Sequence, residues 1–110
     1  MNDPADYPRA TLDIIVCATA DFFRLRPDDI YGFRDDTAAV MPRALAIWIA
    51  RNRFGLATDD IARGFGRLPV IVSEAEDMIK EEINQRTPFW IEAHRLIPRI
   101  TQEVHAFLRY

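Results

Sequence analysis

The sequence predicts a small all-α domain, and three observations support this fold class. Apolar residues recur at three- and four-residue spacings along most of the chain, as on one face of a helix. Prolines and glycines separate these stretches at positions where helices begin and end. No segment alternates apolar and polar residues in the manner of a half-buried strand. With 110 residues, 49% of them hydrophobic, we expect one domain over residues 1–110 around a single core.

Three helices are expected in the first half of the chain. An amphipathic helix over 10–23 is predicted by apolar residues at helical spacing, namely Leu12, Ile15, Val16, Ala20 and Phe23. A short helix should run from Pro27, which suits a first helical position, to Gly32, which ends it. A longer helix over 39–53 is apolar on almost every face, so we expect it to be central and Trp48 to lie in the core.

Two helices separated by a short turn are expected next. Thr58 is a candidate N-cap for a short helix that ends at about Gly64, and residues 65–68 form the turn. The following helix should begin at Pro69 and reach about Asn84, because its apolar residues form one stripe.

The last segment is expected to be a C-terminal helical extension over 87–110. Thr87, followed by a proline, is a candidate cap for its first helix. Helical spacing of apolar residues continues across Pro98, which cannot sit inside a regular helix without breaking a backbone bond. We therefore expect a kinked helix or two abutting helices.

Charge and composition favour a cytoplasmic protein that does not depend on nucleic acid. The formal net charge is −3 and the pI about 5.3, whereas a compact DNA-binding domain usually has a basic face. The first residues are acidic and polar, unlike a signal peptide, and no run is long enough for a membrane span. Cys17, the one cysteine, lies in an apolar run and is expected to be a buried, reduced thiol.

Enzymatic and metal-binding functions find no support in the residue pattern. His94 and His105 would lie about 16 Å apart on one continuous helix, too far to share a metal ion. Neighbouring carboxylates are mostly consecutive and do not converge on one substrate. The phosphate-binding Gly-x-x-x-x-Gly-Lys loop is missing, and no nucleophile stands beside a base. We expect a protein that is not an enzyme, with no cofactor and no metal.

A helix-turn-helix motif and a family resemblance come from the stretch between Arg34 and Ile83. A Pro-Arg pair opens the long apolar helix, Ile61 precedes a Gly-Phe-Gly-Arg turn by three residues, and a helix begins just past that turn. In this order and spacing, residues 11–85 resemble the C-terminal DNA-binding domain (domain IV) of the bacterial replication initiator DnaA. The resemblance implies a Trp-repressor-like (TrpR-like) helical fold, with the C-terminal helix added to it.

The residues that read DNA in this family are mostly replaced. Family members carry a Gly-Gly-Arg-Asp-His-Thr-Thr motif at the turn, and only its arginine is matched in the corresponding residues Arg67, Leu68, Pro69, Val70 and Ile71. The family's basic loop corresponds to Arg34, followed here by Asp35 and Asp36. Arg43 matches an arginine that contacts phosphate in the family, but the glutamine that often follows it is Ala44.

The helix that would read DNA carries the wrong charge for that task. One lysine, Lys80, stands against five acids, a net charge of −4, and the acids are Glu74, Glu76, Asp77, Glu81 and Glu82. Affinity for duplex DNA comes largely from cations that displace its counterions, so an acidic helix would repel the duplex. In contrast, Leu68, Val70 and Ile71 would form an apolar patch if exposed, and such patches commonly mark protein-binding surfaces.

The leading functional prediction is a non-enzymatic relative of DnaA domain IV that regulates chromosomal replication initiation through a protein partner. The resemblance suggests DnaA or one of its regulators as that partner, with binding to double-stranded DNA weakened or lost and no role for a membrane. The alternative is a sequence-specific double-stranded DNA-binding protein of replication initiation or transcription, and simple self-association is a third reading. The candidate contact residues for DNA or a partner are Arg34, Arg43, Arg63, Arg67, Leu68, Val70, Ile71 and Glu74.

Overall fold

The computed structural model describes residues 6–32 and 37–108, and in this part of the chain it confirms the all-α class. The helices are α1 (Asp6–Phe22), α2 (Pro27–Tyr31), α3 (Thr37–Asn52), α4 (Thr58–Gly64), α5 (Val70–Gln85), α6 (Pro88–Ala93) and α7 (Leu96–Leu108). Of these helices, none has the length and apolar character needed to cross a membrane.

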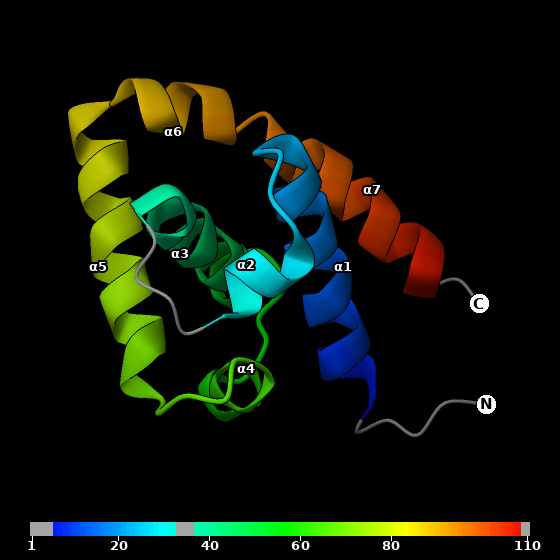
Figure 1. Cartoon of the computed structure of the whole chain (residues 1–110). Helices are drawn as coiled ribbons and strands as arrows, with labels where there is room; N and C mark the ends of the chain where they lie inside the picture. The colour runs from blue at the N-terminus through cyan, green and yellow to red at the C-terminus, as the bar shows by residue number, and fades with distance from the viewer. Residues whose placement is uncertain (1–5, 33–36, 109–110) are drawn as a thin grey trace.

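Helix α3 lies at the centre of the molecule, between α5 on one side and α1 on the other (Figure 1). Helix α2 packs on α1 and α3, and α4 contacts α1, α3 and α5. At the opposite end of α5, α6 leads the chain across to α7, which lies along α1 (Figure 1). The single core predicted from composition is therefore built around α3.

The central position of α3 follows from its composition. Residues on most of its faces are buried, including Pro42 near its start and, in its middle, Leu45, Ala46, Ile47, Ile49 and Ala50. The prediction for Trp48 was only partly right, because its side chain is half-buried and packs against the core from the edge. Its ring lies against the Trp90 ring of α6, with the two centroids 5.5 Å apart.

Helix α2 occupies the range that its proline and glycine predict. Pro27 is the first helical residue, and the backbone N–H of Arg26 donates to the Asp29 carboxylate at 2.9 Å. Gly32 follows the helix, and its N–H donates to the Asp28 carbonyl at 2.8 Å. A Cβ atom at Gly32 would lie 2.8 Å from that same carbonyl oxygen, so a larger residue would disturb the end of α2.

Two predicted helix starts are shifted by one residue. Thr58 is the first residue of α4, and the N-cap position belongs to Ala57, whose side chain offers no capping bond. Pro69 occupies the N-cap position of α5 instead of its first helical position. By contrast, the prediction for Thr87 is confirmed, because its hydroxyl oxygen accepts a hydrogen bond from the Trp90 N–H at 3.3 Å.

The C-terminal segment consists of two abutting helices, which is one of the two arrangements expected from the sequence; the other was a single kinked helix. The break falls between α6 and α7, so Pro98 lies in the first turn of α7, where its missing N–H costs no helical bond. The buried face of α7, formed by Leu96, Ile97, Ile100 and Val104, belongs to the same core as α1. An ion pair of 2.8 Å between Arg99 and Asp21 also joins α7 to α1.

The expectation that Cys17 is buried was wrong. Cys17 is exposed on α1, although its neighbours in the sequence are apolar. Partial desolvation, followed by the negative charges of Asp13 and Glu103, raises the pKa of the Cys17 thiol. The thiol is therefore protonated at neutral pH and is a weak nucleophile.

Candidate functional site

The turn between α4 and α5 is anchored from inside the fold. Phe65 is buried, and its ring centroid lies 5.0 Å from that of Tyr31, next to the end of α2. Gly66 has a φ of 62°, a left-handed conformation that glycine adopts without strain. The N–H of Arg67 donates to the Ala62 carbonyl at 2.9 Å, which closes the turn back onto α4. The start of α5 is thus held in a defined position.

Arg43 of α3 and Arg67 of the turn both bind the C-terminal end of α2. Arg43 donates from Nε to the Ile30 carbonyl at 2.6 Å and from Nη2 to the Asp29 carbonyl at 3.0 Å. Arg67 donates from Nη2 to the Gly32 carbonyl at 2.5 Å. Carbonyls at the C-terminal end of a helix lack partners within the helix. Cations are favourable there, because this end of the helix dipole carries a partial negative charge.

These bonds assign both arginines a role within the protein. Arg43 is only 5% exposed, although the family resemblance implies a phosphate contact at this position. To reach a phosphate it would have to leave two backbone carbonyls of α2 behind. Arg67, the one arginine matched in the family's turn motif, is half-buried and donates its hydrogen bond to the Gly32 carbonyl.

The predicted apolar patch is smaller than the sequence suggested. Leu68 is 75% exposed and Val70 54% exposed, so these two side chains do face solvent at the start of α5. Ile71 is only 9% exposed, and the expectation that it belongs to the patch was wrong. The reason is the rotation of α5, which places Ile71 on the same buried stripe as Ala75. We call Leu68 and Val70 the turn patch.

Four of the eight candidate residues lie around one hollow of about 140 Å³ between α3 and α5. The apolar part of its lining includes Ala44 and Ile47, and the candidates that line it are Arg43, Arg67, Ile71 and Glu74. The turn patch does not line this hollow. Arg63 lies on α4, exposed, and pairs with Asp60 at 3.0 Å. Arg34 lies outside the described residues.

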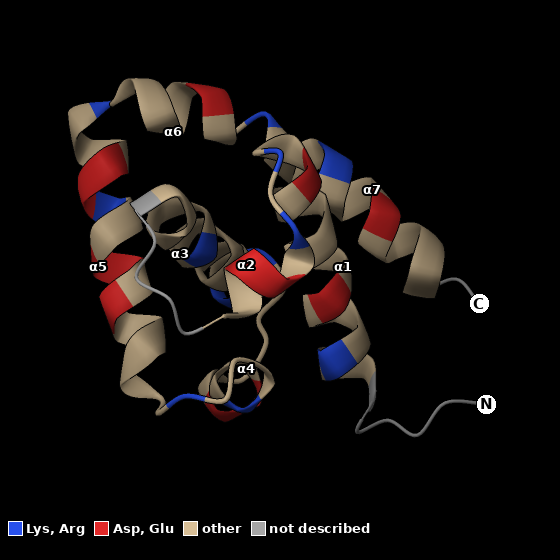
Figure 2. Cartoon of the chain, in the orientation of Figure 1, with Lys and Arg blue, Asp and Glu red and all other residues tan. Residues whose placement is uncertain are grey.

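Acidic residues recur along α5 from Glu74 onward, after a first turn without charges (Figure 2). Exposed Glu74, Asp77 and Glu81 lie along this helix, with Lys80 as its one cation. Glu76 is half-buried, and its carboxylate accepts a hydrogen bond of 3.4 Å from the Asn52 side chain at the end of α3. A duplex approaching these residues would meet mostly carboxylates, which repel phosphates.

A second hollow between α3 and α5 was not anticipated from the sequence. It measures about 350 Å³ and lies between Trp48 and Asn52 on α3 and a row of polar residues on α5. The apolar neighbours of Trp48 in the sequence predict a core residue, which hides its second role in lining this hollow. The four-residue spacing of Trp48 and Asn52, which places both on one face of the helix, is the signal that would have found it.

The fold and this site define an all-α domain in which two arginines hold the end of one helix, and an acidic helix follows an exposed apolar turn. No protein-family model matches the sequence. The chain is similar to the chromosomal replication initiator protein DnaA of Leifsonia xyli subsp. xyli, with 30% identity over 89 residues. This similarity supports the predicted DnaA-like relationship.

The similar stretch covers 80% of this chain but only 19% of the relative, so the chain spans about a fifth of the length of that protein. The relationship therefore concerns one portion of DnaA.

Proposed function

We propose that this chain is a non-enzymatic protein related to domain IV of DnaA, which regulates chromosomal replication initiation in the cytoplasm through a protein partner. In this proposal α4, the turn and α5 correspond to the helix-turn-helix, and binding to the duplex recognised by DnaA is weakened or lost. The similarity to DnaA supports the association with replication initiation. The partner would be DnaA or one of its regulators.

The observation that carries this proposal is the combination of charges and apolar groups at the start of α5. Two arginines that could neutralise phosphates are bound to the carbonyls of α2. The exposed side of α5 is acidic, and the turn before it presents Leu68 and Val70 to solvent. Exposed apolar side chains beside polar ones suit a protein partner better than a phosphate backbone.

The first prediction is that the protein does not bind the DnaA recognition duplex tightly. Specific complexes with duplex DNA typically reach dissociation constants of about 10⁻⁸ to 10⁻¹¹ M at physiological salt. We expect values weaker than about 10⁻⁶ M by fluorescence anisotropy, with little difference between the recognition sequence and a scrambled one. A tight complex that the scrambled duplex does not form would contradict the proposal and establish the DNA-binding alternative.

The second prediction concerns the turn patch. The double variant Leu68→Asp with Val70→Asp should lose binding to purified DnaA from the same organism, or to its regulators, by at least tenfold in calorimetry. Its melting temperature should stay close to that of the parent, because exposed substitutions usually change stability by no more than about 0.5 kcal/mol.

Leu108→Asp is the matched control for this experiment, since Leu108 is 49% exposed on α7, away from the turn. It introduces the same kind of charge and should leave partner binding unchanged. Equal losses in the double variant and in Leu108→Asp would show that partner binding does not depend on the turn patch.

The alternative function, sequence-specific binding of double-stranded DNA, is favoured by the similarity to DnaA itself and by exposed Arg63 on α4. In that case Val70 would contact a thymine methyl group and Arg63 would contact the phosphate backbone. The duplex titration above decides between the two functions. Self-association through the turn patch would instead appear as a concentration-dependent mass in sedimentation that Leu68→Asp abolishes.

A further inference from the structure

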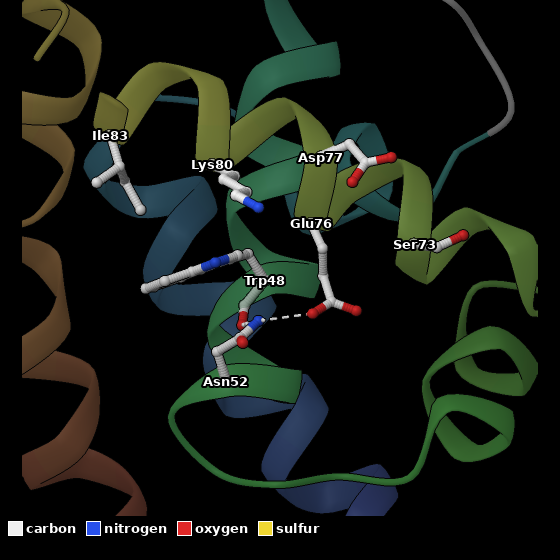
Figure 3. A pocket seen from close by; sticks show the side chains of 7 residues that line it. All are labelled: Trp48, Asn52, Ser73, Glu76, Asp77, Lys80 and Ile83. Carbon is white, nitrogen blue, oxygen red and sulfur yellow. Dashed lines mark hydrogen bonds between the residues drawn. The ribbon is translucent and has the colours of Figure 1, made fainter. Parts of the chain in front are cut away.

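The larger hollow between α3 and α5 has a lining suited to a cationic side chain. It measures about 350 Å³, and its polar lining includes Asn52, Glu76, Asp77 and Lys80. Figure 3 shows the Trp48 indole below Lys80, with the Glu76 carboxylate to one side of it and Asp77 directed outward. An aromatic ring and a carboxylate thus face the same space.

The Trp48 indole is held in place by its neighbours. Its ring packs edge-on against Trp90, with an angle of 82° between the two ring planes. The residue is half-buried, so part of the indole stays open to the hollow. A guanidinium group stacks favourably on an indole face, because the face of the ring is negative and the guanidinium is planar and weakly hydrated.

The Glu76 carboxylate is also positioned before any ligand binds. Asn52 donates from Nδ2 to Glu76 at 3.4 Å, and the same amide nitrogen donates to the Trp48 carbonyl at 3.1 Å. A carboxylate has lone pairs for several donors, so the Asn52 bond leaves capacity for a guanidinium. Carboxylate and guanidinium can then form two parallel hydrogen bonds.

We propose that this hollow binds an arginine side chain of a protein partner, with the guanidinium between the Trp48 indole and the Glu76 carboxylate. Two acids, Glu76 and Asp77, and one lysine line the hollow, so the local charge favours a cation. This site is separate from the turn patch and does not depend on the partner being a replication protein.

A neighbouring hollow indicates what else the bound segment carries. It measures about 390 Å³, shares Ile83 with the arginine site, and is lined further by Arg86, Trp90, Ile91 and His94. The Trp48 and Trp90 rings, which touch, connect the two hollows. The apolar part of this lining, formed by Ile83, Trp90 and Ile91, suits a large apolar residue next to the bound arginine.

Lys80 makes the sign of the ligand's charge testable. It is exposed on a flexible stem and lines the hollow, with its ammonium directed toward the Trp48 side (Figure 3), where it would repel an arginine and attract an anion. Removing this charge should strengthen the binding of a cation and weaken the binding of an anion. Removing the Glu76 charge should have the opposite effects.

The test uses the full chain with Trp90→Phe, which leaves Trp48 as the only tryptophan. The probe is the peptide acetyl-Gly-Arg-Leu-Gly-amide, and the same peptide with glutamine in place of arginine is its control. We expect saturable quenching of Trp48 fluorescence with a millimolar dissociation constant, because a single side chain in an open hollow contributes little binding free energy. The glutamine peptide should give no saturable change.

Three variants complete the experiment. Glu76→Gln should weaken peptide binding about threefold to fivefold, and Lys80→Gln should strengthen it, consistent with the modest effect of exposed ion pairs. Glu74→Gln, which removes the same charge from α5 outside this hollow, should change affinity less than twofold. Equal weakening by Glu76→Gln and Glu74→Gln, weaker binding by Lys80→Gln, or the lack of saturable quenching would each overturn the proposal.

Discussion

Replacing Arg43 with leucine is expected to lower the free energy of unfolding by about 3 kcal/mol, because hydrogen bonds from charged donors typically contribute roughly 1.5–3 kcal/mol each. The variant leaves the Asp29 and Ile30 carbonyls at the end of α2 without the guanidinium that binds them. Leucine fills part of the space of arginine but donates no hydrogen bond. Thermal unfolding followed by circular dichroism should show a melting temperature lower by about 10 °C or more.

Arg63→Leu is the matched control, because Arg63 is exposed and its ion pair with Asp60 lies at the surface. Surface ion pairs contribute little, so this variant should change stability by less than about 1 kcal/mol. If Arg43→Leu unfolded at the same temperature as the parent, the bonds to α2 would not be stabilising. Arg43 would then again be a candidate for phosphate contact.

Replacing Ile79 with alanine is expected to destabilise the protein by about 2–5 kcal/mol, the usual cost of truncating a buried aliphatic side chain. Ile79 is fully buried on α5, where that helix packs against the central α3. Small domains have only roughly 5–15 kcal/mol of stability, so this loss is a large fraction of the total. Urea unfolding should show a clearly lower midpoint with little change in slope.

Leu68→Ala is the control for Ile79→Ala, since it removes a similar amount of apolar side chain from a residue that is 75% exposed. It should change stability by no more than about 0.5 kcal/mol. An equal destabilisation by both variants would indicate that the turn is part of the core, in contradiction to the exposure of Leu68.

The helices could be predicted because their signals are local. Periodic apolar residues, Pro27 with Gly32, and the cap at Thr87 act within one or two turns of the chain. The exposure of Cys17 was also within reach of the sequence. Asp13, Cys17 and Asp21 are spaced four residues apart, so the polar face of α1 passes through the cysteine.

The site depended on contacts that no local pattern contains. Arg43 binds carbonyls 13 and 14 residues away, and Arg67 binds one 35 residues away. The family resemblance identified these arginines as candidate contact residues but could not show that they bind the carbonyls of α2. The burial of Ile71, by contrast, was within reach of the sequence, because Ile71, Ala75 and Ile79 are spaced four residues apart on the apolar stripe of α5.

The packing of α7 on α1 means that the folding unit extends beyond residues 11–85, the stretch in which the sequence pattern indicated the family resemblance. Leu96, Ile100 and Val104 would leave a hydrophobic furrow on α1 if they were removed. A shortened version that stops near residue 85 would then present that furrow to solvent and be prone to aggregation. For recombinant fragments and fusions, the cooperative unit to preserve extends through Val104, including the Arg99 ion pair with Asp21.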